Sequence, residues 1–196
     1  MRPTALRNII FSTLLLFLVF QSSQVFTSSG NPPTSSTGAP NEGTCRGCHG
    51  GTSLNGGAFK DSVILESNIP ATGYLPDSTY EVTLRFHQPG VNTMGFQLTV
   101  LDSATNQFRG DLSESSNRLN TGNAFVNGSS REYVYHTGLG NSASSNRISW
   151  TFNWQAPSSA SGPVYFYFTL NASNNNGGSS GDTIYAKSTF IPLNDN

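Results

Sequence analysis

Both cysteines of the chain lie in one short motif, Cys45–His49, whose sequence is C-R-G-C-H. This spacing is typical of covalent c-type haem attachment. In that chemistry two thiols add to the porphyrin vinyl groups as thioethers, and the adjacent histidine supplies one axial nitrogen to the iron. We therefore expect Cys45 and Cys48 to hold haem c and His49 to be the proximal iron ligand. Gly51 and the glycine before it are expected to let the chain leave close to a flat ring.

Three other chemistries fit the same residues less well. A thiol-redox pair would normally open a helix in a βαβ setting, whereas Gly, Pro and Asn surround this motif. A structural zinc site would need a fourth ligand beside Cys45, Cys48 and His49. A disulfide between the two cysteines would close a very small loop and stabilise little. Haem attachment is the interpretation that uses all three side chains.

Few residues are available for the second axial position. Outside the motif the chain has two histidines, His87 and His136, and one methionine besides Met1. We rank His136 first, because it ends a short alternating segment just before a glycine turn, where a side chain can project from a sheet rim. Met94 is the second choice, and its alternative role is core packing. His87 is third, because Pro89 follows it closely, as at an ordinary strand end.

Composition excludes some functions. The chain has 196 residues, of which ten are basic and eleven acidic, so it should form one domain and not a nucleic-acid-binding surface. It shows no spacing typical of a catalytic triad, a carboxylate pair or a phosphate loop, so we predict no catalytic residue.

Trp150 and Trp154 are expected in the core. Four acidic residues could gather around Ca²⁺, but without the spacing of a calcium loop we expect them to be solvated: Asp102, Asp111, Glu114 and Glu132.

The N-terminus resembles an export signal. Arg2 and Arg7 precede an apolar run, Ile9–Phe20, which small polar residues follow. The run is about a dozen residues long, shorter than the roughly 20 that a membrane anchor needs, so we predict a cleaved signal peptide over residues 1–27. Cleavage leaves eight basic and eleven acidic residues, a net charge of −3. We expect a periplasmic, cell-surface or secreted protein that meets the membrane only during export.

The remaining chain divides into an arm and a β domain. Residues 28–56 are rich in Pro, Gly and Ser, which predicts a linker and haem-attachment arm. Without haem, the part from Thr37 to Gly56 is expected to be protease-sensitive. Residues 57–196 predict an all-β, two-sheet sandwich, with a barrel as the alternative, and residues 107–130 are expected to be a long loop. Alternating apolar residues predict seven strands: Phe59–Leu65, Tyr80–His87, Gly95–Asp102, Glu132–Thr137, Arg147–Trp154, Val164–Asn171 and Thr183–Phe190.

Several blocks together resemble a family of exported bacterial proteins. The blocks are Thr37–Gly51, Gly95–Leu101, Tyr133–Thr137, Trp150–Pro157 and Gly181–Tyr185. That family carries a haem-attachment motif followed by a Reelin-like (reeler-type) β-sandwich, often described as the choice-of-anchor V domain. The resemblance implies an immunoglobulin-like sandwich over about residues 37–190, and it strengthens His136. Many such relatives carry a C-terminal sorting segment, whereas this sequence ends at Asn196 soon after its last predicted strand, and this departure puts surface anchorage in doubt.

Three functions follow as hypotheses. The first is one-electron transfer through a single six-coordinate haem, which needs a redox partner protein and implies no enzyme. The second is a five-coordinate haem that acts as a sensor or a peroxidase. The third is an extracellular adhesion or binding module of reeler type, in which haem mainly fastens the arm onto the sandwich.

Overall fold

The structure is a computed structural model that describes residues 30–159 and 161–194. The predicted signal peptide lies outside these residues, as does the start of the predicted arm. No helix in the described part of the chain is long and apolar enough to cross a membrane.

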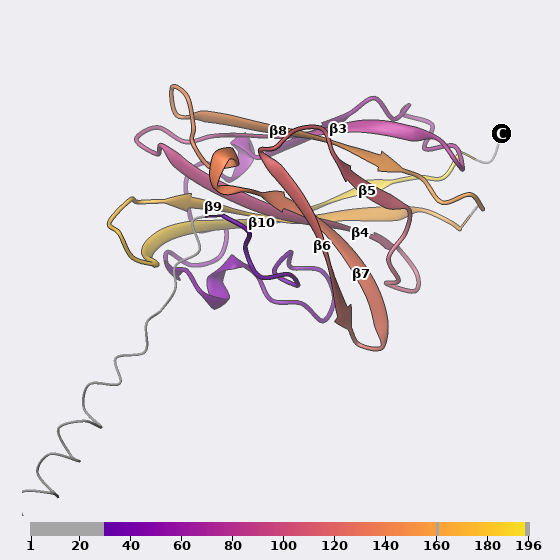
Figure 1. Ribbon diagram of the computed structural model, residues 1–196, viewed down its shortest axis with the longest axis horizontal. Coiled ribbons are helices and arrows are strands. Elements are labelled where there is room, and N and C mark those ends of the chain that lie inside the picture. Colours follow the sequence, from indigo (N-terminus) through magenta and orange to yellow (C-terminus); the bar gives the residue numbers. More distant parts are fainter. Residues whose placement is uncertain (1–29, 160, 195–196) are drawn as a thin grey trace, which may run out of the picture.

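The described residues form two sheets packed face to face (Figure 1), which confirms the all-β sandwich. One sheet has the order β1-β10-β9-β4-β7-β6 and the other β2-β3-β8-β5. Every strand pairing is antiparallel except that of β1 with β10. The strands are β1 (Gly50–Gly51), β2 (Ile64–Ser67), β3 (Thr79–His87), β4 (Thr93–Asp102), β5 (Asp111–Glu114), β6 (Leu119–Val126), β7 (Ser129–His136), β8 (Arg147–Gln155), β9 (Val164–Ser173) and β10 (Ser180–Ile191). Three short 3₁₀ helices accompany them: η1 (Cys45–Gly47), η2 (Lys60–Ser62) and η3 (Gly138–Gly140).

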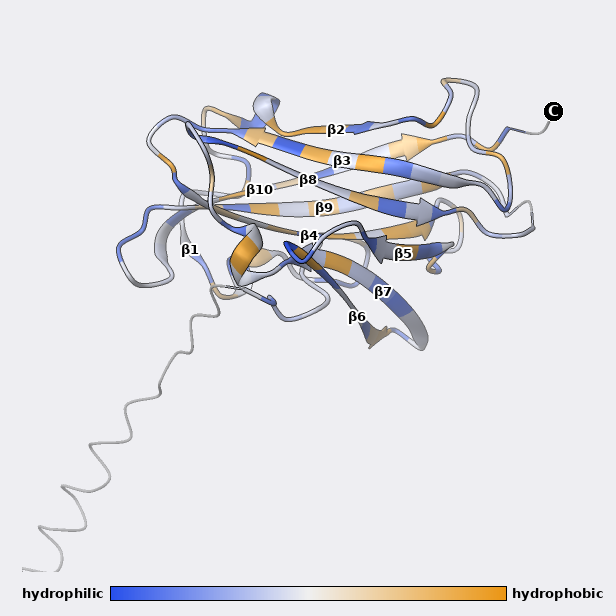
Figure 2. Ribbon diagram, turned by 45° about the horizontal axis from the view of Figure 1, so that its top comes forward, coloured by the Kyte–Doolittle hydropathy of each residue, from blue (hydrophilic) through white to orange (hydrophobic). Residues whose placement is uncertain are grey.

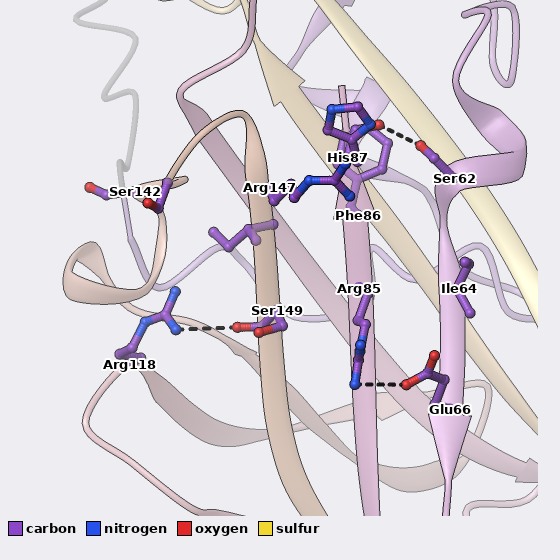
Figure 3. Close-up of a pocket in the computed structure, with 12 residues that line it drawn as sticks. Ser62, Ile64, Glu66, Arg85, Phe86, His87, Arg118, Ser142, Arg147 and Ser149 are labelled. Atoms are coloured by element: carbon purple, nitrogen blue, oxygen red, sulfur yellow. Dashed lines mark hydrogen bonds and ion pairs between the residues drawn. The ribbon is translucent and has the colours of Figure 1, made fainter. Parts of the chain in front are cut away.

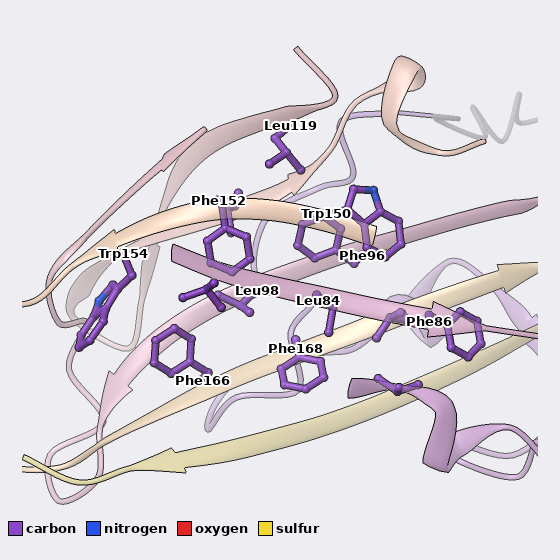
Figure 4. Close-up of a cluster of buried hydrophobic side chains, with 14 of the residues drawn as sticks. Leu84, Phe86, Phe96, Leu98, Leu119, Trp150, Phe152, Trp154, Phe166 and Phe168 are labelled. Carbon is purple, nitrogen blue, oxygen red and sulfur yellow. The ribbon is translucent and has the colours of Figure 1, made fainter. Parts of the chain in front are cut away.

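Aromatic side chains from both sheets fill the space between them. Alternate residues of β8 point inward and are buried, and Figure 2 shows the same alternation of hydropathy along β3. Trp150 packs on Phe96 with ring centroids 4.5 Å apart, and Trp154 meets Phe166 edge-on at 5.2 Å (Figure 4). Both tryptophans are therefore core residues, as predicted.

The structure corrects two predictions. Residues 107–130 are not a long loop, because they contain β5 and β6. The turn Asn127-Gly128 has positive φ at both residues, 47° and 81°, and joins β6 to β7 as a two-residue hairpin. The predicted strand Phe59–Leu65 instead begins with η2, and its strand is Ile64–Ser67.

The arm lies along the outer face of the six-stranded sheet, seen in indigo and violet in Figure 1. Backbone groups of the arm bond to polar side chains that point outward from β4 and β9. Ser36 N donates to Gln97 Oε1 at 2.8 Å, Gln97 Nε2 donates to Pro33 O at 2.9 Å, and Thr169 Oγ1 donates to Ser36 O at 2.6 Å. This covering explains why both faces of β4 are buried, although only one faces the core.

A buried ion pair holds the next part of the arm. Arg131 of β7 donates from Nη1 to Glu42 Oε1 at 2.6 Å, and the two side chains are 2% and 0% exposed. Tyr133 Oη donates to the same oxygen at 2.9 Å, and Thr37 Oγ1 donates to Glu42 Oε2 at 2.6 Å. Arg131 also donates to the backbone oxygen of Pro40. The opposite charges and these hydrogen bonds offset the cost of burying the pair, although Arg131 Nε is buried without a partner among the described residues.

Removing one partner of this pair should be costly. Glu42→Gln leaves the Arg131 charge buried without a counter-ion, so we expect a loss of about 3–5 kcal/mol in the free energy of unfolding. Glu66→Gln is the matched control, because it removes a carboxylate from the surface pair Arg85–Glu66, whose side chains are 58% and 48% exposed. That control should cost about 1 kcal/mol or less. Denaturant unfolding measures both, and equal losses would contradict the role given to Glu42.

Candidate haem site

The predicted site residues meet in one pocket of about 430 Å³ on the outer face of the six-stranded sheet. Its lining includes the first and second choices for the distal ligand together with the whole C-x-x-C-H triad: Cys45, Cys48, His49, Met94 and His136. His87 is elsewhere, because it lines a groove on the four-stranded sheet. Segments about 90 residues apart in the sequence thus line one cavity. Its volume lies within the range of about 300–1,000 Å³ that is typical of ligand pockets.

A tight turn brings the motif side chains together. Thr44 caps η1, since its Oγ1 accepts from Arg46 N at 3.3 Å. The chain then closes on itself, and His49 N donates to Cys45 O at 2.9 Å. This turn needs no left-handed backbone at the glycine between the thiols, because the positive-φ residues of the described chain do not include it.

The two thiols have different surroundings. Cys45 is held beside β9, with Sγ 3.0 Å from Thr169 Oγ1, while Cys48 is exposed. Burial raises the pKa of the Cys45 thiol to about 11. A redox-active cysteine reacts as an accessible thiolate, so this environment opposes the thiol-redox alternative. Within the described residues, no three His, Cys, Asp or Glu side chains are grouped as a metal-ion site. A thioether is uncharged and suits a buried sulfur.

Asp182, which the sequence analysis did not single out, orients His49. Its Oδ2 lies 2.6 Å from His49 Nδ1, and its side chain is fully buried. The amide of Asn171 lies 3.2 Å from the same oxygen. The contact requires close approach of β1 and β10, because a Cβ at Gly51 would lie 1.9 Å from Asp182 O. Gly51 therefore serves this strand pairing, and its role beside a flat ring stays a prediction. A carboxylate on Nδ1 leaves Nε2 as the coordinating atom.

His136 occupies the point where β7 leaves β4. Its Nδ1 lies 3.0 Å from Phe96 N and 3.1 Å from Phe96 O, so the imidazole replaces the backbone of β7 in the ladder. When Nδ1 donates to Phe96 O, Nε2 carries the lone pair, and in the described chain Nε2 has no hydrogen-bond partner. Burial lowers the pKa of His136, partly opposed by the Phe96 bond and reinforced by His49. A neutral imidazole is the form that binds a metal.

Gly95 makes room for this imidazole. A Cβ at Gly95 would lie 2.4 Å from Cε1 and 2.6 Å from Nε2 of His136. The ring can therefore lie across β4 only because residue 95 has no side chain. Met94, its neighbour, is 1% exposed and belongs to the hydrophobic core cluster, which is the alternative role considered for it.

These residues fit a covalently attached haem. The chain offers two thiols for thioethers, and two imidazoles whose Nδ1 atoms are held by Asp182 and Phe96. The apolar side chain of Pro32 also lines the pocket, whereas Phe96 lines it through its backbone, because its side chain packs on Trp150 in the core. Glu42 and Gln97 hold the arm on the six-stranded sheet through bonds that do not involve a haem. These contacts argue against an arm that is loose without haem, and a protease experiment tests this.

Among the described residues, the four acidic side chains do not form a group that could hold a metal ion. Asp102 is 4% exposed, not solvated as expected. Its Oδ1 accepts from Ala104 N and Thr105 N, and its pKa is lowered because these bonds and Arg109 outweigh the effect of burial. The other three lie at the β5–β6–β7 edge, where they accept from backbone or remain exposed: Asp111, Glu114 and Glu132.

No protein-family model matches the sequence, and no curated protein matches it significantly. Among solved structures, the chain is similar to the human F-spondin reeler domain, with 17% identity, a TM-score of 0.46 and coverage of 74% of this chain and 91% of that chain. A structure of the Reelin-N domain of F-spondin has 18% identity and a TM-score of 0.46, and the match covers 77% of this chain and 96% of that chain. A cohesin module from a Clostridium perfringens family 33 glycoside hydrolase has 12% identity and a TM-score of 0.45, and the match covers 67% of this chain and 98% of that module.

Proposed function

We propose that this chain is an exported c-type haem protein that transfers single electrons. Haem would be attached through Cys45 and Cys48, with His49 and His136 as axial ligands. The observation that carries the proposal is the pocket itself, in which both thiols and two imidazoles from distant segments meet. A bound haem would supply a one-electron iron couple.

The protein's contribution would be to fix its ligands in advance. Asp182 holds Nδ1 of His49, and the backbone of Phe96 holds Nδ1 of His136, so each ring keeps one orientation. Binding of iron at Nε2 of His136 would select the tautomer in which Nδ1 donates to Phe96 O. Ligands held in this way would move little when the iron gains or loses an electron. With both axial positions filled by protein, a substrate could reach iron only by displacing a ligand. Electron transfer therefore fits better than a five-coordinate sensor or peroxidase, and it calls for a redox partner protein.

Export of the chain is part of the proposal. It rests on the N-terminal pattern of basic residues, short apolar run and small polar residues. The pattern agrees with the motif, since c-type haem attachment takes place outside the cytoplasm.

The proposal first requires that haem is bound covalently to the two cysteines. Expressed with a c-type maturation system, the protein should keep its haem through acid-acetone extraction and on a denaturing gel stained for haem. The Cys45→Ala, Cys48→Ala double variant should lose that stain. Its arm should nevertheless stay protected from protease over residues 37–44, because Glu42 and Arg131 hold it without haem. A colourless parent protein, or haem that extracts freely, would overturn the proposed function.

The distal ligand can be identified from visible spectra. His136→Ala should change the ferric haem from low-spin to high-spin and open the iron to cyanide or carbon monoxide. His87→Ala should leave the spectrum unchanged, because His87 lies on the other sheet. If the His136 variant stays low-spin while Met94→Ala does not, the distal ligand is the thioether of Met94.

A second variant tests His136 without removing it. Gly95→Ala places a methyl group where the imidazole lies, so the ring must move and the low-spin spectrum should weaken. Gly138→Ala is the matched control, because a Cβ there meets nothing within 4 Å. A low-spin Gly95→Ala protein with parental melting temperature would show that His136 does not occupy this position in the haem-loaded protein.

Asp182 should lower the reduction potential of the haem iron. A carboxylate on Nδ1 makes imidazole a stronger donor and favours ferric iron. Asp182→Asn keeps an acceptor but removes the charge, so we expect the reduction potential to rise by roughly 60 mV, which is about tenfold in a one-electron equilibrium. Asp61→Asn removes an equal charge from an exposed residue and is the control. Spectroelectrochemistry measures both, and equal shifts would assign the effect to net charge alone.

A further inference from the structure

Two surfaces outside the haem site carry opposite charge. The first is a groove of about 760 Å³ on the outer face of the four-stranded sheet (Figure 3). We call it the basic groove, after the three arginines among its lining residues: Arg85, Arg118 and Arg147. Glu66 is the carboxylate of this lining, and it pairs with Arg85 at 2.9 Å. Three arginines against one glutamate leave the groove with an excess of positive charge.

The fold does not neutralise this excess. Arg118 Nη1 donates to the backbone oxygen of Ser149 at 3.2 Å, which brings no full negative charge. Arg147 is exposed, and the ion pairs of the described residues do not include it. Ile64, which is 46% exposed, adds apolar surface to the same groove. A complementary partner would therefore combine carboxylates with an apolar side chain.

The second surface lies on the hairpin of β6 and β7. Figure 1 shows the tip of this hairpin projecting away from the rest of the sandwich. Phe125, close to the tip, is 77% exposed. It lies on the same face of β6 as Leu119, which reaches the core, because side chains two, four or six positions apart share a face. The projecting part of the hairpin has no strand opposite it, so Phe125 faces solvent.

Carboxylates lie on this same face of the hairpin. Glu132 is the register partner of Asn123, so its side chain lies on the face that carries Phe125. Glu132 Oε2 accepts from Leu112 N at 2.8 Å, which places it next to Asp111 on β5. Two carboxylates therefore lie near the exposed phenyl ring.

Glu114 adds a third carboxylate, since its Oε1 accepts from Thr121 Oγ1 at 2.9 Å on the same face of β6. The ion pairs of the described residues include none of the three carboxylates. Burial raises the pKa of Glu132, the bond from Leu112 N opposes this, and the charges of Asp111 and Glu114 raise it further. Like charges this close disfavour one another unless a cation approaches. We call this the acidic hairpin surface, made of Phe125 and the three carboxylates.

The two surfaces lie toward opposite ends of β8. Arg147 is the first residue of β8, whereas Asp111 on β5 is the register partner of Gln155, its last residue. At about 3.3 Å per residue these two ends are about 26 Å apart. One molecule therefore cannot close its own hairpin surface onto its own groove. Two copies can make the contact, and each then keeps one surface free, which is the arrangement of a heterologous, head-to-tail interface.

We propose that the acidic hairpin surface of one copy binds in the basic groove of a second copy, so that the chains associate head to tail. Phe125 would cover the apolar surface at Ile64, and the three carboxylates would approach Arg85, Arg118 and Arg147. Guanidinium groups bind carboxylates through paired N–H donors. At physiological ionic strength charges are screened beyond about 8 Å, so these local charges outweigh the acidic net charge of the chain.

Analytical ultracentrifugation of the full haem-loaded protein tests the association. At low salt the average mass should rise with concentration, and added salt should reverse this by screening the contact. Phe125→Arg and Arg147→Glu should each weaken association at least about tenfold. Phe190→Arg and Arg46→Glu are the matched controls, because they make the same changes at exposed residues elsewhere. Each control should change the dissociation constant by less than about twofold.

A mixture of the two variants tests the direction of the contact. Phe125→Arg keeps an intact groove and Arg147→Glu keeps an intact hairpin surface. Each alone should be monomeric where the parent protein associates, while an equal mixture should form a dimer and nothing larger. A misfolded variant could not restore the contact in this way, so loss of folding is distinguished from loss of the interface.

Several results would overturn the proposal. One is a parent protein that stays monomeric at about 1 mM, where even a weak complex forms. Another is an Arg147→Glu protein that associates like the parent, which would indicate symmetric pairing of two hairpins. A mixture that stays monomeric, or controls that weaken association as much as the test variants, would also overturn it. Haem attachment is measured separately on each variant, so these results do not bear on the proposed electron transfer.

Discussion

The buried pair of Glu42 and Arg131 decides where the C-x-x-C-H motif lies. The arm contains little regular structure, and its prolines and glycines give it no conformation of its own. An extended segment of this kind is ordered only if its backbone groups find partners. Glu42 accepts from Arg131, Tyr133 and Thr37 at once, so only one register of the arm satisfies the carboxylate. Cys45 follows three residues later and is thereby placed on β9.

That placement divides the sandwich into two unlike faces. The outer face of the six-stranded sheet carries residues that bond to another segment, such as Gln97 and Thr169, and one residue without a side chain, Gly95. The outer face of the four-stranded sheet carries Arg, Ser and Thr and remains open. The two outer faces share a core of aromatic side chains, which is tightly packed and makes the sheets a rigid support for both. A change on one face should therefore have little effect on the other.

The sequence predicted the regular parts of the molecule and the local motif. Alternation along β3 and β8 located both strands, because one face of each meets the core and the other meets water. It failed at β6, an edge strand whose central residues 120–123 (N-T-G-N) show no apolar alternation. Asn127-Gly128 is a hairpin signal that could have revealed this strand. The pocket shows that His136 and Cys45 come together. Asp182 and Gly95 could not be found from the sequence, because their roles depend on which strands are neighbours.

The two imidazoles of the site are held differently, and this sets their order of strength. His49 faces a buried carboxylate, whereas His136 faces a backbone carbonyl, which carries only a partial charge. A ligand whose Nδ1 proton is shared with an anion donates more strongly through Nε2. His49 is also tied to the chain within one residue of a cysteine, while His136 keeps its position by packing over Gly95. In the proposed haem protein, His136 would accordingly be the ligand that iron loses more easily, so conversion to a five-coordinate, ligand-binding state would begin at the end of β7.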